Sequence, residues 1–289
     1  MLHRKDSQLP LPSVNTISKR QRLIIGHRGA SALAPENTLA ALSRALHDGA
    51  DGVELDVRLA RDGVPVVIHD STLRRTGLCE GVIARMTSKE LAATNVGEWF
   101  NRLHPKLARQ EYLGATVRTL ESVFDWFSAG HNPSALANAL IYVEMKTDEA
   151  EQSSHELAQT VVQQINEHSL QSRVVVVSFN LKAIVQIKQI DSAISTGALF
   201  KPKRNLTNFV RKQKMLAAAI QSGADEILLH RLIAGPRTVR AAISNNLRAV
   251  VWTVDDPTWM RRARRLGIHV LITNNPAQMV AASGTDFSL

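Results

Sequence analysis

Residues 49–70 read GADGVELDVRLARDGVPVVIHD, and this segment is the most informative one for predicting the fold. The segment from Gly52 to Val57 is apolar and rich in β-branched residues, which is typical of a buried strand. A second strand is predicted from Val64 to Ile68, too close for a crossover helix, because a parallel return needs about a dozen residues. Asp62-Gly63 between them is a strong hairpin signal. The second strand is therefore predicted to run antiparallel to the first.

The rest of the chain alternates short apolar segments with segments of helical periodicity. Without the return strand eight strands remain, each followed by a helical segment, which indicates βα units and a mostly parallel sheet. Eight such units in 289 residues predict an α/β protein built as a (β/α)8 barrel, with its active site at the C-terminal ends of the strands. A doubly wound sheet is the alternative, but no glycine-rich dinucleotide fingerprint follows any strand. The predicted strands are 23–26, 52–57, 140–145, 174–179, 195–200, 226–229, 249–254 and 270–273, and the predicted helices are 36–48, 119–128, 149–168, 180–190, 206–222, 236–245, 257–266 and 276–282.

Two segments lie outside this regular pattern. Residues 1–21 are interpreted as a mobile basic tail, so that residues 22–289 form a single barrel domain. Residues 72–117 separate the return strand from the next predicted helix and contain one short predicted helix at 88–95. Because a long irregular segment in a compact domain usually forms a lid or a binding surface, we expect an insertion over the barrel mouth.

The composition is that of a globular protein without a membrane span. Hydrophobic residues make up 44% of the chain, which argues against a disordered protein, and no apolar run is long enough to cross a bilayer. Cys79 cannot form an internal disulfide, and residues 1–22 lack the apolar run of a secretory signal, so a cytoplasmic location is expected. The net charge of +9 is scattered and aromatic residues are only 4%, which favours solvated helix faces over a specific nucleic-acid partner. Nothing in the sequence indicates an oligomeric state.

The predicted strand at 52–57 carries two carboxylates, Glu54 and Asp56. Because side chains alternate across a strand, both face the same side, whereas Val53 and Leu55 suit packing against helices on the other side. Two inward carboxylates repel each other unless a cation lies between them. We therefore predict a bound metal ion here, in preference to an outward-facing strand paired with neighbouring helices.

Two histidines are predicted to join these carboxylates. His27 and Arg28 follow the first strand, where a barrel does its chemistry, although a capping histidine beside a surface arginine would give the same pattern. Counting back along both arms of the hairpin puts His69 opposite Leu55 or Asp56. The return strand thus brings a second imidazole to the same mouth.

The third barrel strand supplies a further carboxylate and an ammonium group, because Glu144 and Lys146 share one of its faces. Three carboxylates without a cysteine partner suit Mg²⁺ or Ca²⁺ rather than zinc. Arg28 and Lys146 can neutralise a tetrahedral anion, and the two histidines can serve as acid and base. This set of groups describes metal-assisted cleavage of a small anionic phosphodiester.

These residues, in this order, resemble the glycerophosphodiester phosphodiesterase family from about Leu23 to Met279. The resemblance implies a (β/α)8 barrel that hydrolyses glycerophosphodiesters to an alcohol and sn-glycerol 3-phosphate with one divalent cation, Mg²⁺ or Ca²⁺, with Mn²⁺ as a further candidate. The matching motifs are HRGA at 27–30, PENT at 35–38, GADGVELDV at 49–57, DG at 62–63, VIHD at 67–70, LRRT at 73–76, TLE at 119–121, EMK at 144–146, SF at 178–179 and WTV at 252–254.

The resemblance also implies a role for each matching residue. It implies metal ligands at Glu54, Asp56 and Glu144, an acid and base pair at His27 and His69, phosphate contacts from Arg28 and Lys146, and pocket walls from Phe179 and Trp252. Two alternatives stay open. The substrates can be lysophospholipids whose acyl chain lies against Trp99, Phe100 and Leu103, residues that can equally form the insertion's own core. The barrel can also be a non-catalytic anion-binding module.

The chain departs from the family pattern at two places. Asn274 stands in Thr-Asn-Asn-Pro where the family usually has Thr-Asp followed shortly by Pro, and Asp255 follows the tryptophan motif where Asn is common. Neither is expected to be a catalytic position, so at most the shape or stability of the last loops should change. Residues 35–38 are interpreted mainly as the opening of the first helix.

Overall fold

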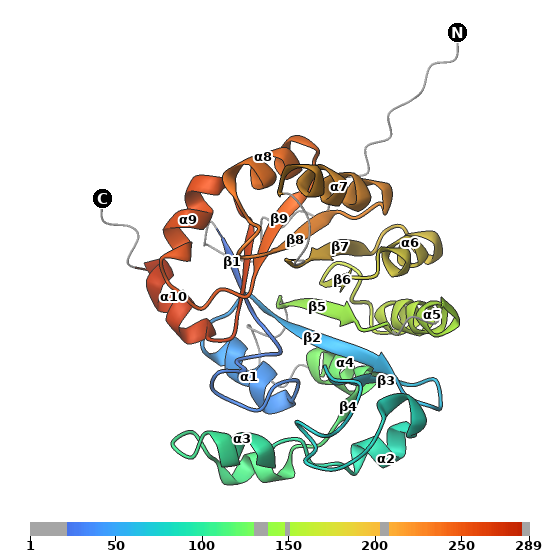
Figure 1. The fold of residues 1–289 in the computed structure, drawn as a ribbon. Helices are drawn as coiled ribbons and strands as arrows, with labels where there is room; N and C mark the ends of the chain where they lie inside the picture. The colour runs from blue at the N-terminus through green and yellow to red at the C-terminus, as the bar shows by residue number, and fades with distance from the viewer. Residues whose placement is uncertain (1–21, 130–137, 148–150, 203–207, 285–289) are drawn as a thin grey trace.

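Eight parallel strands form a closed barrel with helices around its outside in the computed structural model of the chain (Figure 1). The structure describes residues 22–129, 138–147, 151–202 and 208–284. The predicted basic tail, residues 1–21, lies outside the described residues. The predicted (β/α)8 architecture is confirmed.

The barrel strands agree with the predicted strands to within a few residues at each end. In chain order they are β1 (Leu23–Gly26), β2 (Gly52–Leu59), β5 (Leu140–Met145), β6 (Val174–Ser178), β7 (Ser195–Phe200), β8 (Glu226–His230), β9 (Arg248–Trp252) and β10 (Val270–Thr273). Around the barrel their order is β1-β10-β9-β8-β7-β6-β5-β2, and pairing of β1 with β2 closes the ring. Phe179 and Val254, predicted as the last residues of strands, lie just beyond β6 and β9.

The helices that follow the barrel strands also correspond to the predicted ones. They are α1 (Leu39–His47), α4 (Leu120–Ser128), α5 (Glu151–Glu167), α6 (Leu181–Ile190), α7 (Asn208–Gln221), α8 (Pro236–Ser244), α9 (Trp259–Leu266) and α10 (Pro276–Gly284). The largest difference is at α1, which begins at Leu39 rather than at residue 36. Its N-cap is Thr38, whose hydroxyl accepts a hydrogen bond from the backbone of Ala41 at 3.3 Å.

The hairpin after β2 forms as predicted. Strand β3 (Pro65–Val67) is shorter than the predicted segment and pairs antiparallel with β2, with Val57 opposite Val67. Gly63 in the turn has a φ of +76°, a conformation that favours glycine. Continuing the register places His69 opposite Leu55, as predicted. A two-residue strand, β4 (Arg118–Thr119), adds to the outer edge of β3 and was not predicted, because two residues are too few for a periodic pattern.

Side chains along β2 alternate between two environments. Val53, Leu55 and Val57 pack into the apolar layer between strands and helices, together with residues of α1, α4 and α5. Glu54 and Asp56 lie on the opposite face, toward the barrel interior, and are buried. The predicted orientation of the two carboxylates is therefore correct.

The insertion, residues 72–117, packs beside the mouth against the hairpin and α1 (Figure 1). It contains α2 (Ser88–Ala92), close to the predicted short helix, and α3 (Glu98–Leu103), which was not predicted. Trp99 and Phe100 are buried in a small core of their own, so they do not line an acyl-chain groove, and Leu103 is 69% exposed. Within the described segments, no helix combines the length and the apolar character needed to span a bilayer.

Candidate active site

Three buried carboxylates meet at the C-terminal end of the barrel. Glu54 and Asp56 come from β2, and Glu144 lies opposite Asp56 on the neighbouring strand β5. One oxygen atom from each residue lies within 4.8 Å of the others. The structure therefore brings the three predicted ligands together in a cluster of a kind that can hold a metal ion.

The electrostatics of this cluster are those of an acidic site that needs a cation. Burial, together with the neighbouring charge of Asp56, raises the pKa of Glu54 to about 8 and that of Glu144 to about 7. Burial acts in the same direction on Asp56, but Lys146 and Arg28 hold its pKa well below the usual range. Among the described residues, Glu54 Oε1 is buried and has no hydrogen-bond partner. An unpartnered buried carboxylate oxygen fits a metal ligand.

Two cations of the chain contact the carboxylates directly. The ammonium group of Lys146 lies 3.1 Å from Asp56 Oδ1 and also contacts Glu144. The guanidinium of Arg28 lies 3.2 Å from Asp56 Oδ2, and its backbone N–H donates to Glu54 Oε2 at 2.9 Å. Arg28 holds a positive φ of 53°, a strained conformation for a non-glycine residue that is often found at functional sites.

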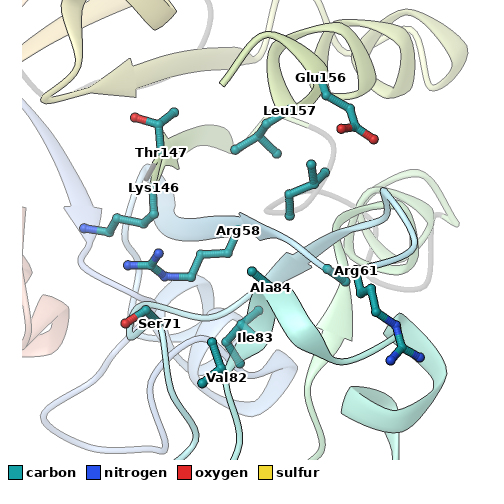
Figure 2. Close-up of a pocket in the computed structure, with 12 residues that line it drawn as sticks. Arg58, Arg61, Ser71, Val82, Ile83, Ala84, Lys146, Thr147, Glu156 and Leu157 are labelled. Atoms are coloured by element: carbon teal, nitrogen blue, oxygen red, sulfur yellow. The ribbon is translucent and has the colours of Figure 1, made fainter. Parts of the chain in front are cut away.

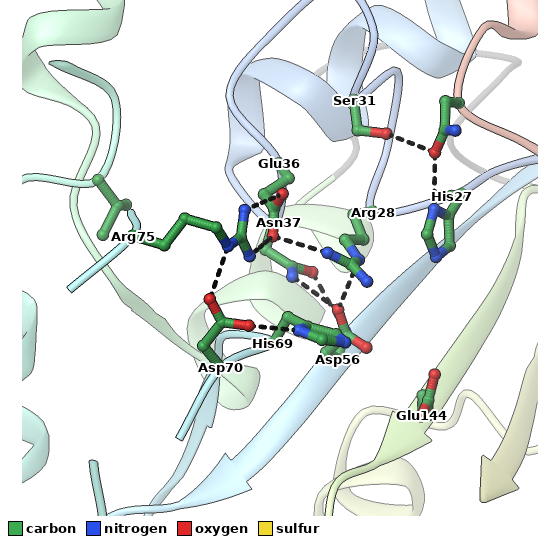
Figure 3. Close-up of polar contacts among 12 residues, drawn as sticks. His27, Arg28, Ser31, Glu36, Asn37, Asp56, His69, Asp70, Arg75 and Glu144 are labelled. Atoms are coloured by element: carbon green, nitrogen blue, oxygen red, sulfur yellow. Dashed lines mark hydrogen bonds and ion pairs between the residues drawn. The ribbon is translucent and has the colours of Figure 1, made fainter. Parts of the chain in front are cut away.

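Glu36 and Asn37, interpreted from the sequence as part of a helix opening, take part in the site (Figure 3). The Asn37 amide donates to Asp56 Oδ2 at 2.8 Å, and its carbonyl oxygen accepts from the Asp56 backbone at 3.1 Å. Glu36 accepts a hydrogen bond from Arg28 at 2.9 Å. Thr38 is the N-cap of α1. The signal in the sequence was a Glu-Asn pair before that cap, where the helix itself requires neither.

His27 lies beside the carboxylates, and its two ring nitrogens face different partners. Its Nε2 is 3.9 Å from Glu54 Oε2, and its Nδ1 is 2.7 Å from Asn274 Oδ1. Burial, followed by the nearby charge of Arg28, lowers the pKa of His27. The expectation that Asn274 affects only the last loops is therefore wrong, because the amide contacts a predicted catalytic histidine.

His69 is held from the other side of the cluster by a carboxylate. Its Nδ1 lies 2.6 Å from Asp70 Oδ1, and its ring interacts electrostatically with Asp56. Arg75 of the insertion donates to Asp70 Oδ2 at 2.6 Å and, through two nitrogens, to both oxygens of Glu36 at 2.7 Å. Because Glu36 also binds Arg28, an unbroken set of hydrogen bonds joins Arg28 to His69 (Figure 3). We call Glu36, Arg75 and Asp70 the Arg75 bridge.

Aromatic side chains form one wall of the mouth. The rings of Phe179 and Trp252 pack edge to face with centroids 5.5 Å apart, and His230, not singled out in the sequence, lies 5.2 Å from Trp252. Lys146 Nζ lies 5.9 Å from the centroid of the Phe179 ring. Phe179 therefore lies beside Lys146 of the ion cluster, and Trp252 packs against Phe179.

A cavity of about 190 Å³ opens next to Lys146, between the β2–β3 hairpin, the insertion and α5 (Figure 2). Arg58 lines its polar side and donates from Nε to the carbonyl oxygen of His69 at 2.8 Å. Its apolar wall consists of Leu59, Ala60, Val82, Ile83, Ala84 and Leu157, and the three carboxylates do not line it. A second cavity, of about 340 Å³, is lined by His27, Arg28 and Glu36 together with Asp255 and Asn274.

Comparison with known proteins identifies the family of the chain. The model of the glycerophosphoryl diester phosphodiesterase family matches residues 27–278. The chain belongs to this family. It is 28% identical over 272 residues to a glycerophosphodiester phosphodiesterase of Bacillus subtilis, which covers 91% of this chain and 86% of the relative. It is 29% identical over 258 residues to a glycerophosphodiester phosphodiesterase of Caldanaerobacter subterraneus, which covers 89% of this chain and 96% of the relative.

Solved structures show the same architecture. A phosphodiesterase of Oleispira antarctica in complex with the product sn-glycerol-3-phosphate has a TM-score of 0.75 at 24% identity and covers 91% of this chain and 96% of its own. A glycerophosphodiester phosphodiesterase of Agrobacterium tumefaciens has a TM-score of 0.71 at 24% identity and covers 90% of this chain and 99% of its own. The barrel is thus the fold of known glycerophosphoryl diester phosphodiesterases.

Proposed function

We propose that the protein is a metal-dependent glycerophosphodiester phosphodiesterase that releases an alcohol and sn-glycerol 3-phosphate. The observation that carries the proposal is the meeting of Glu54, Asp56 and Glu144 between two histidines. Family membership supports the reaction class, and the product bound to the Oleispira antarctica phosphodiesterase supports the substrate class.

The three carboxylates would hold one divalent cation, with Mg²⁺, Ca²⁺ and Mn²⁺ as candidates. Glu54 and Glu144 have raised pKa values, so each exchanges its proton for the ion on binding. When bound, such an ion neutralises charge on the phosphate oxygens and favours nucleophilic attack at phosphorus. Carboxylate oxygens are hard ligands, which fits these ions.

The residues of the chain supply the remaining chemistry. Arg28 and Lys146 place positive charge where the non-bridging oxygens of a phosphodiester would lie. One of the two histidines takes the proton from the attacking oxygen as the new P–O bond forms, and the other gives a proton to the alcohol oxygen as the old P–O bond breaks. Phe179 would form a wall of the substrate site beside Lys146.

The test is a panel of glycerophosphodiesters supplied with each candidate metal. Glycerophosphocholine and glycerophosphoethanolamine should release sn-glycerol 3-phosphate, and lysophosphatidylcholine should be a poor substrate because Trp99 and Phe100 are buried. His27→Asn and His69→Asn should each lower kcat by at least about 100-fold while circular dichroism stays unchanged. His47→Asn, on the exposed side of α1, is the matched control and should retain full activity.

Two results contradict the proposal. If the purified protein cleaves none of these diesters with Mg²⁺, Ca²⁺ or Mn²⁺, the chain is an anion-binding barrel rather than an enzyme. If either histidine variant keeps near-normal kcat, that histidine is not the acid or the base.

A further inference from the structure

Asp255 lies in the loop between β9 and α9, and it orients the side chain of Asn274, the residue that directly follows β10. Asp255 Oδ1 accepts hydrogen bonds from the Asn274 backbone N–H at 2.7 Å and from Thr273 Oγ1 at 2.9 Å. Its Oδ2 lies 2.8 Å from the Asn274 side-chain nitrogen Nδ2. An ionised carboxylate can only accept, so the end of the amide that faces Asp255 must be the donating NH₂ group. The amide of Asn274 therefore has one orientation.

The other end of that amide, the oxygen Oδ1, faces His27. Ser31 Oγ donates to this oxygen at 3.0 Å, and His27 Nδ1 lies 2.7 Å from it. An amide oxygen has no proton to give, so the hydrogen bond to His27 requires a proton on Nδ1. In the neutral ring Nε2 is then unprotonated, and Nε2 is the atom on the side of the carboxylates, 3.9 Å from Glu54 Oε2.

We propose that Asp255 and Asn274 form a positioning pair that selects the Nδ1-protonated form of His27 and fixes the direction of its ring. Asp255 acts at one remove, through the amide, and neither residue is a catalytic residue. The kinetic part of this inference rests on the proposed function, because it assigns the pair to the same site. In many enzymes a hydrogen bond to one ring nitrogen of a histidine fixes which nitrogen carries the proton.

The two positions at which the chain departs from the usual family pattern are thus in direct contact. Compared with that pattern, the carboxylate and the amide have exchanged places. The pair still contains one carboxylate, which only accepts hydrogen bonds, and one amide, which both donates and accepts. A carboxylate at either position therefore requires an amide at the other. Single changes should therefore be harmful, and the double exchange should be tolerated.

The mechanism of damage differs between the two single variants. Asp255→Asn removes the acceptor that fixes the amide, so Asn274 can rotate and present its NH₂ group to His27. Asn274→Asp places two carboxylates within hydrogen-bond distance of each other, where like charges repel. Each single variant should lower kcat by about 10- to 100-fold with KM changed less than about twofold, the range for loss of a supporting hydrogen bond. The double variant Asp255→Asn/Asn274→Asp should recover most of the loss.

A structural measurement tests the same inference without any turnover. In the metal-free protein labelled with ¹⁵N-histidine, at about pH 8 where the ring is neutral, His27 should show a protonated Nδ1 and a bare Nε2. The His27→Asn variant assigns the resonance. Asp255→Asn should shift the ring toward a mixture of the two tautomers, and thermal unfolding checks that each variant is folded.

The inference and the proposed function fail separately. A protonated Nε2 in the unaltered protein overturns the inference, whether or not the protein is an enzyme. So do single variants with unchanged kcat, or a double variant no better than the single ones. Absence of diester hydrolysis would remove the proposed function, and the NMR result would still decide the role of the pair.

Discussion

Replacing Arg75 by methionine removes the centre of the Arg75 bridge while keeping an unbranched side chain similar to the aliphatic part of arginine. Its guanidinium makes three hydrogen bonds of 2.6–2.7 Å to Glu36 and Asp70. A hydrogen bond to a charged group contributes about 1.5–3 kcal/mol, whereas exposed ion pairs contribute about 0–1 kcal/mol. The Arg75 side chain is 42% exposed and that of Glu36 only 9%, so solvent screens part of the interaction. We expect Arg75→Met to lower the free energy of unfolding by about 2 kcal/mol in total.

The same substitution should also lower activity, because the two ends of the bridge hold the predicted catalytic residue His69 and the predicted phosphate contact Arg28. Asp70 would still contact His69 but would lose its own hydrogen bond from Arg75. Glu36 would be left with Arg28 as its only cationic partner among these residues. A displacement of about 1 Å in a positioned group can cost about 100-fold in rate, so a fall in kcat of about 10- to 100-fold is expected. The assays are urea denaturation and steady-state hydrolysis of glycerophosphocholine with saturating metal.

Arg74→Met is the matched control for this experiment. Arg74 is the preceding residue and forms an ion pair with Glu80 at 2.9 Å, but the two side chains are 71% and 79% exposed. Its loss should change the free energy of unfolding by less than about 0.5 kcal/mol and leave kcat unaltered. If Arg75→Met leaves both stability and kcat unchanged, or if Arg74→Met does equal damage, the bridge does not support the site.

Four further predictions concern the metal site, the stability of the metal-free protein and the substrate. Affinity for Mg²⁺ should increase as the pH rises from about 6 to about 9. The reason is that Glu54 and Glu144, with pKa values of about 8 and about 7, would lose protons when the ion binds. Calorimetry in buffers of different ionisation enthalpy measures the number of protons released. In the metal-free protein the same raised pKa values mean that these two carboxyl groups bind more protons in the folded than in the unfolded state, so their contribution to the free energy of unfolding should fall as the pH rises from about 5 to about 8. The lowered pKa values of His27 and His69 act in the opposite direction, so the test compares the protein with Glu54→Gln/Glu144→Gln, and an equal pH dependence in the two would contradict the assignment. Asp56→Asn should abolish Mg²⁺ binding in calorimetry and, by leaving buried cations without their partner, lower the free energy of unfolding by about 3 kcal/mol. Phe179→Ala should raise KM about tenfold with kcat nearly unchanged, and an unchanged KM would remove Phe179 from the substrate wall.

The barrel and most of the candidate site could be predicted from the amino-acid sequence. The two-residue periodicity of a strand predicts which side chains of residues 52–57 share a face. The Asp62-Gly63 turn predicts the hairpin register that brings His69 beside the carboxylates. These conclusions were accessible because they depend on neighbours along the chain. The order of strands in a βα barrel follows the order of the sequence, so residues at successive strand ends meet at one mouth.

The contacts that hold the site residues in place became visible only in the folded chain. Arg75 contacts Glu36 across 39 residues of sequence, and His27 contacts Asn274 across 247. No local pattern specifies such contacts, since a surface arginine, a helix-opening glutamate and a loop asparagine look the same whether or not they meet. The chain closes β1 against β10, and this closure alone brings the last loop against the first histidine. The candidate catalytic groups could thus be predicted from strand geometry, whereas their supporting contacts depend on the closure of the barrel and the packing of the insertion.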